Sequence, residues 1–95
     1  MQLERREVVR ALRKKYFTEE KGSRNHDFYF LIVDNKRTGI FTKVSRGTEY
    51  KTLQEKLIKS MAEQIRLEKT QFVDLVSCSL SGDGYLKILR DTNQL

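Results

Sequence analysis

Six consecutive apolar residues, Phe28 to Val33, constrain the fold of this chain more than any other feature. The run reads Phe-Tyr-Phe-Leu-Ile-Val, and aromatic and β-branched residues of this kind favour a β-strand. We therefore predict a strand over residues 27–33. Because its side chains are apolar on both faces, this strand should lie in the centre of a sheet.

Two further strands are predicted beside this one. The segment 34–39, Asp-Asn-Lys-Arg-Thr-Gly, is rich in residues that tolerate positive φ and predicts a turn. Residues 40–45 then alternate between two faces, which is typical of a half-buried strand antiparallel to the central one. Residues 16–21 predict a short strand that a loop over residues 22–25 joins to the central strand.

An amphipathic helix is predicted over residues 2–15. Val8, Val9 and Leu12, continued by Tyr16, form an apolar stripe at helical spacing. The rest of the circumference is basic, and a solvated face is favoured there over a phosphate-binding one. The residues of this face are Arg5, Arg6, Arg10, Arg13 and Lys14.

A second helix follows the strands and is expected to cover one side of the sheet. Thr52 and Glu55 have the spacing of a capping box, and Thr48 is an alternative start. The apolar face of this helix consists of Leu53, Leu57, Ile58, Met61, Ala62 and Ile65.

After Lys69 the pattern fits two structures. Residues 72–80 fit a strand or a short helix capped by Thr70, and we prefer the helix because a strand would have to join the sheet across the preceding helix. Ser-Gly-Asp-Gly at 81–84 predicts a break, and residues 85–89 predict a last short helix. Cys78 is expected to be a buried, small hydrophobic residue and not a nucleophile, because no second histidine is present to activate it.

Together these segments predict an α+β fold, a three-stranded antiparallel sheet with flanking helices in the order α-β-β-β-α plus short C-terminal helices. A length of 95 residues is that of a single domain. Within it, residues 1–67 are expected to form the core and residues 68–95 a C-terminal helical extension.

The positive charge of the chain is concentrated in its first half. Residues 1–51 hold thirteen Lys/Arg against seven Asp/Glu, a difference of +6, whereas residues 52–95 hold six of each. Such an asymmetry suits a basic face that binds a polyanion, because phosphate contacts supply most of the affinity for nucleic acid. The alternative is a basic protein without such a partner.

The residue counts exclude several classes of site. One His and one Cys cannot supply the four nitrogen or sulfur ligands of structural zinc, and no phosphate-binding glycine motif occurs, so we expect no metal and no cofactor. A single cysteine permits no intrachain disulfide and indicates a reducing compartment such as the cytoplasm. No apolar run approaches the ~20 residues of a membrane span, so no membrane partner is expected.

Residues 21–29 read Lys-Gly-Ser-Arg-Asn-His-Asp-Phe-Tyr and precede an aromatic strand, a turn, a third strand and a helix. In this order, over residues 21–67, the chain is similar to the HicA-type toxin family of mRNA interferases. The resemblance implies a double-stranded-RNA-binding-like fold, an RNA substrate that is cleaved, and neutralisation by an antitoxin-like protein partner. It also implies that the loop histidine, His26, is catalytic and that Gly22 and Ser23 belong to its loop.

Cleavage of RNA without a metal ion needs a base for the 2′-hydroxyl proton and positive charge beside the phosphorane. Histidine suits the first task, since its ordinary pKa of ~6.5 leaves it partly neutral at neutral pH. Dependence on the 2′-hydroxyl would exclude DNA as a substrate. The candidate RNA-binding residues are Lys21, Gly22, Ser23, Arg24, Lys43 and Arg46.

Other interpretations of these residues stay open. His26 is alternatively a strand-entry histidine bonded to Asp27 or to a loop carbonyl. The aromatic residues at 28–30 can stack on bases, but a core role is favoured. The whole chain is alternatively a non-catalytic nucleic-acid-binding module, or a protein–protein adaptor that binds an acidic partner through its basic half and docks through residues 67–95.

Overall fold

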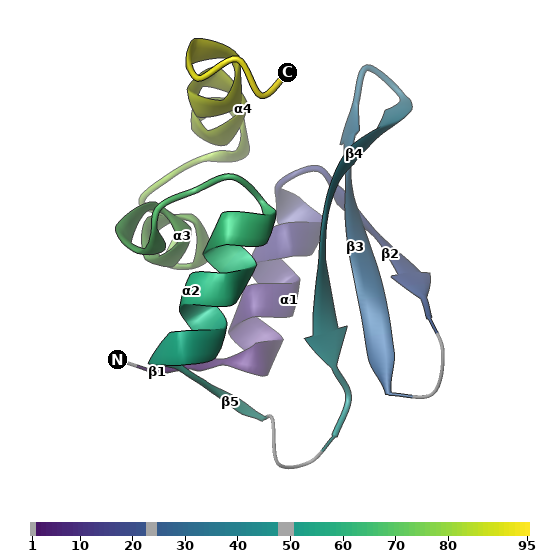
Figure 1. The fold of residues 1–95 in the computed structure, drawn as a ribbon, viewed down its shortest axis with the longest axis vertical. Helices are drawn as coiled ribbons and strands as arrows, with labels where there is room; N and C mark the ends of the chain where they lie inside the picture. Colours follow the sequence, from purple (N-terminus) through teal and green to yellow (C-terminus); the bar gives the residue numbers. More distant parts are fainter. Residues whose placement is uncertain (1, 23–24, 48–50) are drawn as a thin grey trace.

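The computed structural model describes residues 2–22, 25–47 and 51–95 and has the expected α+β architecture (Figure 1). The predicted order of a helix, three strands and a helix is present, with two additional short strands. The elements are β1 (Gln2–Glu4), α1 (Arg5–Lys14), β2 (Phe17–Lys21), β3 (His26–Val33), β4 (Lys36–Ser45), β5 (Thr52–Gln54), α2 (Glu55–Gln64), α3 (Lys69–Val76) and α4 (Gly82–Asp91).

The main sheet has the strand order β2-β3-β4, so the prediction that residues 27–33 are central is confirmed. Both pairings are antiparallel. The turn between β3 and β4 is shorter than the predicted 34–39: only Asp34 and Asn35 remain outside the strands, with φ of 51° and 63°. Two adjacent residues with positive φ suit the right-handed twist of a tight hairpin, which lets pairing resume directly at Lys36.

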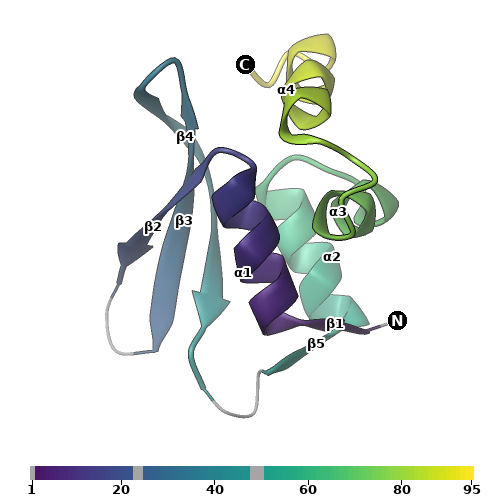
Figure 2. The ribbon, with the colours of Figure 1, turned by 180° about the vertical axis from the view of Figure 1, so that it is seen from behind.

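All the described helices lie on one side of this sheet (Figures 1 and 2). The covered face consists of alternate residues, Tyr29 and Leu31 on β3 and Ile40, Thr42 and Val44 on β4, all of which are buried. Helix α2 lies on the covered side, as predicted, where it borders β4, and α1 lies behind it in the view of Figure 1. None of the described elements covers the opposite face.

The N-terminal prediction of a helix from residue 2 is wrong by three residues, because residues 2–4 form β1 and pair antiparallel with β5. Leu3 faces Leu53 in this pairing, and Leu53 is buried. Thr52 therefore lies in a strand and does not cap α2, whose N-cap residue is Gln54. The alternative start at Thr48 lies outside the described residues.

The segment before β2 also differs from its prediction. Tyr16 is exposed and has a φ of 74°, so it continues neither the apolar stripe of α1 nor the strand, which begins at Phe17. The buried residues of α1 are Val8, Ala11 and Leu12. A left-handed residue at this point turns the chain sharply from the helix into the sheet.

The helical interpretation of the C-terminal segments is confirmed, with different starts. Helix α3 has Glu68 as its N-cap and not Thr70, and the Glu68 amide donates to the Gln71 side chain at 2.9 Å. The predicted break at 81–84 contains the first turn of α4, because the Ser81 hydroxyl accepts a hydrogen bond from the Gly84 amide. Cys78 is exposed, with a φ of 70° in the turn after α3, so the expectation that it is buried is wrong.

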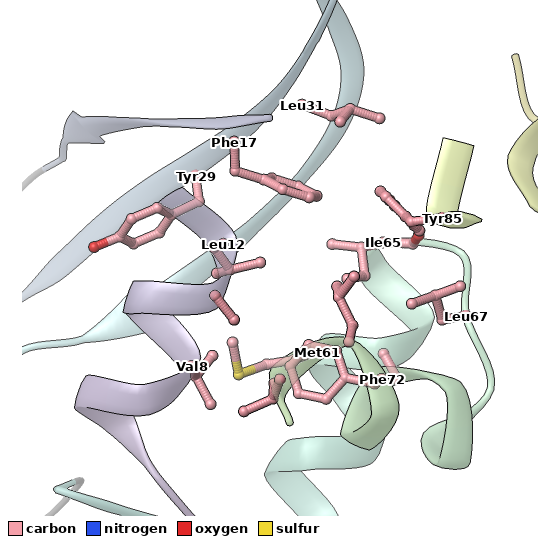
Figure 3. Close-up of a cluster of buried hydrophobic side chains, with 14 of the residues drawn as sticks. Val8, Leu12, Phe17, Tyr29, Leu31, Met61, Ile65, Leu67, Phe72 and Tyr85 are labelled. Carbon is pink, nitrogen blue, oxygen red and sulfur yellow. The ribbon is translucent and has the colours of Figure 1, made fainter. Parts of the chain in front are cut away.

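The buried apolar side chains form one cluster to which residues 1–67 and 68–95 both contribute (Figure 3). Phe17 of β2 stacks on Tyr85 of α4 with ring centroids 5.8 Å apart, and the Tyr85 hydroxyl donates to the Ile65 carbonyl at 2.8 Å. The C-terminal helices thus complete the core beneath the sheet.

Among the described residues, two charged side chains are buried, those of Asp27 on β3 and of Lys15 after α1. Lys15 is 6% exposed, and its Nζ donates to the carbonyls of Leu75 and Leu80 at 2.5 and 2.9 Å. These carbonyls belong to the C-terminal end of α3 and the turn after it, where backbone acceptors lack helical partners and carry partial negative charge. The ammonium group therefore binds the C-terminal helices to the end of α1.

Candidate nucleic-acid interface

His26 is the first residue of β3 and not a loop residue. It pairs with Ser45 at the end of β4, and its carbonyl accepts a hydrogen bond from the Gly22 amide at 3.1 Å, which closes the connection from β2. The side chain is half-buried. Side chains alternate between the two faces of a strand, so His26 belongs with Phe28 to the face that the helices do not cover.

Lys43 shares that face with His26. It is exposed and lies opposite Phe28, diagonal to His26, a relation in which side chains are typically ~7–8 Å apart. Both residues line a groove of about 420 Å³ between β4 and α2. A neighbouring hollow of about 480 Å³ shares Lys43 and Gln64 with this groove and reaches Arg66. A base and a cation thus border one groove.

Two of the predicted RNA-binding residues are grouped around Asp27 instead. Arg46 Nε lies 3.5 Å from Asp27 Oδ1, and Lys21 is the register partner of Asp27 in β2. Asp27 belongs to the covered face of β3, one position away from His26. The predicted RNA-binding residues therefore do not form one cluster. Asp27 lies on the covered side of the sheet with Arg46 near it, whereas His26 and Lys43 lie on the uncovered side.

Of the remaining predicted residues, Ser23 and Arg24 lie outside the described residues, and Gly22 has a clear local role. A Cβ atom at Gly22 would lie 2.3 Å from the Phe28 ring and 2.8 Å from the His26 carbonyl oxygen. Both distances are far below van der Waals contact. Glycine is therefore required where the chain passes over Phe28 to reach His26.

We expect Gly22→Ala to destabilise the fold by about 1–3 kcal/mol, because the new methyl group must displace the Phe28 ring and the backbone at His26. Gly39→Ala is the matched control, since a Cβ at Gly39 has no neighbouring atom within 4 Å. Urea unfolding of both variants measures the difference. Equal midpoints for the two variants would contradict the steric explanation.

Arg5 departs from the prediction that the basic residues of the first helix form a solvated face. Its Nη1 donates to the carbonyls of Ser45 and Gly47, both at 2.8 Å. Arg5 thus connects the start of α1 to the end of β4, and Ser45 is itself the register partner of His26. Sequence spacing held no signal for this contact, because the partners are backbone carbonyls about forty residues away.

Arg13 has a carboxylate partner as well. The Tyr29 hydroxyl donates to Glu19 Oε1 at 2.8 Å, and Arg13 donates to Glu19 Oε2 at 2.8 Å. The hydrogen bond from Tyr29, followed by the interaction with Arg13, lowers the pKa of Glu19 below its usual value. Burial and the neighbouring carboxylate raise the pKa of Tyr29. Much of the charge of Arg13 is therefore offset within the protein.

Aromatic side chains form a patch on the uncovered face, and two of them, Phe28 and Phe30, were expected in the core. Phe28 and Phe30 of β3 meet Phe41 of β4, with ring centroids 5.2–6.2 Å apart. Phe41 is 41% exposed. The guanidinium carbon of Arg37 lies 3.4 Å from the centre of the Phe30 ring. We call Phe28, Phe30 and Phe41 the aromatic patch. Because side chains alternate along β3, Phe28 and Phe30 lie on the opposite face from the buried Tyr29.

In the ranges 2–22, 25–47 and 51–95, no three His, Cys, Asp or Glu side chains are grouped so that they could hold a metal ion. Among the helices of the same ranges, none combines the length and the apolar character needed to cross a membrane. Comparison of the chain with protein-family models, curated proteins and solved structures gave no match.

Proposed function

We propose that this chain is a HicA-like RNA-binding protein that cleaves RNA without a metal ion and uses His26 as the base. The observation that carries the proposal is the position of His26 and Lys43 on one uncovered face, both lining the groove beside α2. The charge asymmetry of the sequence supports a polyanionic ligand. The order α1-β2-β3-β4-α2, with the helices on one face, supports the double-stranded-RNA-binding-like fold.

In the proposed reaction, His26 takes the proton from a ribose 2′-hydroxyl, and the 2′-oxygen attacks the adjacent phosphorus. The bond from phosphorus to the 5′-oxygen breaks, and the 5′-oxygen takes a proton from water or from the protonated imidazole. The products are a 2′,3′-cyclic phosphate and a 5′-hydroxyl. Lys43 offsets the negative charge of the phosphorane. Arg46, near Asp27, has a smaller share in this proposal than the sequence assigned to it.

The test uses a mixed-sequence RNA and a DNA of the same sequence, each incubated with the protein in EDTA. Cleavage of the RNA to cyclic-phosphate ends, with the DNA left intact, is the expected result. Binding of both polymers without cleavage would reject the nuclease and leave a non-catalytic binding module. Absence of RNA binding at low salt, where phosphate contacts are strongest, would reject a nucleic-acid function and favour a protein–protein adaptor.

A further inference from the structure

We infer that the aromatic patch is a stacking platform for the bases of single-stranded RNA. The inference rests on the proposed RNA-binding function and adds the substrate class, unpaired nucleotides. Its first support is position, because Phe28, Phe30 and Phe41 occupy the face of the sheet that no described helix covers (Figures 1 and 2). Phe41 is exposed and Phe28 and Phe30 are partly buried, so the patch is an apolar surface of the kind that can mark a binding site.

The second support is the geometry of the rings. Phe41 is 41% exposed, and its ring lies 5.2 Å from that of Phe30 and 6.0 Å from that of Phe28. The Phe30 and Phe41 planes differ by 31°, and Phe41 is the exposed ring of this pair. Bases stack on such side chains regardless of their identity, because every base has a π-face.

The third support is the charge around the rings, which favours nucleic acid over an apolar protein segment. Arg37 lies over Phe30, and Lys43 is the register partner of Phe28. Glu20 pairs with Arg37 at 2.6 Å, and this ion pair holds the guanidinium over the Phe30 ring. Aromatic rings interleaved with cations are the combination that binds bases and backbone of a single strand together.

The patch also has a defined relation to the proposed catalytic residue. His26, Phe28 and Phe30 occupy alternate positions of β3, each about 7 Å from the next. A strand with a base on Phe41, the register partner of Phe30, could therefore run past Lys43 towards His26. Bases inside a duplex are stacked on each other and cannot reach these rings, so the platform requires unpaired RNA.

The test measures binding to a single-stranded 2′-O-methyl RNA, which lacks the free hydroxyl and cannot be cleaved, and to its blunt duplex. Phe41→Leu keeps an apolar side chain but removes the ring, and we expect it to weaken single-strand binding roughly 5- to 100-fold. Phe41→Tyr, which keeps the ring, should stay within about twofold of the wild type. Duplex affinity should change little for either variant.

A direct signal for stacking is available because the chain contains no tryptophan. The variant Phe41→Trp should lose fluorescence when the single strand binds, and its signal does not depend on the stability of Phe41→Leu. Single-strand binding that is unchanged in Phe41→Leu, or an equal loss for the duplex, would overturn the platform while leaving RNA binding intact. Failure of the wild-type protein to bind any RNA would instead reject the proposed function itself.

Discussion

Replacing His26 with alanine should lower the rate of RNA cleavage about a hundredfold or more, while RNA affinity stays close to that of the wild type. A positioned general base contributes roughly 10²–10⁴ in rate. The substitution should leave the β2–β3 connection intact. The Gly22 amide donates to the backbone carbonyl of His26, and this hydrogen bond does not depend on the imidazole. Single-turnover cleavage and RNA binding should be measured on the same preparations.

Free imidazole distinguishes a catalytic from a purely structural role of His26. Added to His26→Ala, it should restore part of the cleavage rate, because the small base can occupy the space that the side chain leaves. A structural role predicts a lower unfolding midpoint and no rescue. Cleavage by His26→Ala at the wild-type rate would remove His26 from the mechanism.

Replacing Lys15 with methionine should destabilise the protein by about 3 kcal/mol. Methionine matches the length of the lysine stem but donates no hydrogen bond, so the carbonyls of Leu75 and Leu80 lose their hydrogen bonds from the ammonium group, and Leu75 keeps the long one from the Cys78 amide at 3.4 Å. Hydrogen bonds to a charged group contribute about 1.5–3 kcal/mol each, and a buried acceptor left unsatisfied costs about 1–3 kcal/mol. Equilibrium unfolding in urea measures the change.

Lys14→Met is the matched control, since Lys14 is the exposed last residue of α1 and directly precedes Lys15. Its effect should lie within about 0.5 kcal/mol. A loss in Lys15→Met no larger than that in Lys14→Met would show that the ammonium group does not hold α3. Near-ultraviolet circular dichroism should report the loosening at Tyr85, which packs where α4 meets the sheet.

The sequence was sufficient for those parts of the fold that have strong periodicity. The apolar run at 28–33 identified the central strand, and the helical spacing identified the buried face of α2, Ile58, Met61 and Ala62, although Leu53 of the same predicted face lies in β5. By contrast, β1 and β5 have three residues each and exist through their pairing with each other, so neither segment shows a pattern of its own. Lys15 was missed for a similar reason, because its acceptors are backbone carbonyls sixty residues away.

The candidate site was only partly accessible to sequence reasoning. Residue types led to His26 and Lys43, which the structure places on one face, whereas Arg46 was assigned to the same cluster without knowledge of Asp27 beside it. Because the side chains of residues 28–33 are apolar on both faces of β3, the sequence suggested that both faces are buried. Whether a second layer covers Phe28 depends on the number and placement of the helices, which no local pattern determines.

The pairing of β1 with β5 has a consequence for the order in which the chain assembles. Glu4 pairs with Thr52, so these two short strands close a loop that contains α1 and the whole main sheet. Closing so long a loop from a disordered chain costs conformational entropy that three residue pairs cannot offset. Formation of the β2–β3 and β3–β4 hairpins reduces the length of disordered chain between β1 and β5. We therefore expect the β1–β5 ladder to form late in folding and to open early in local unfolding.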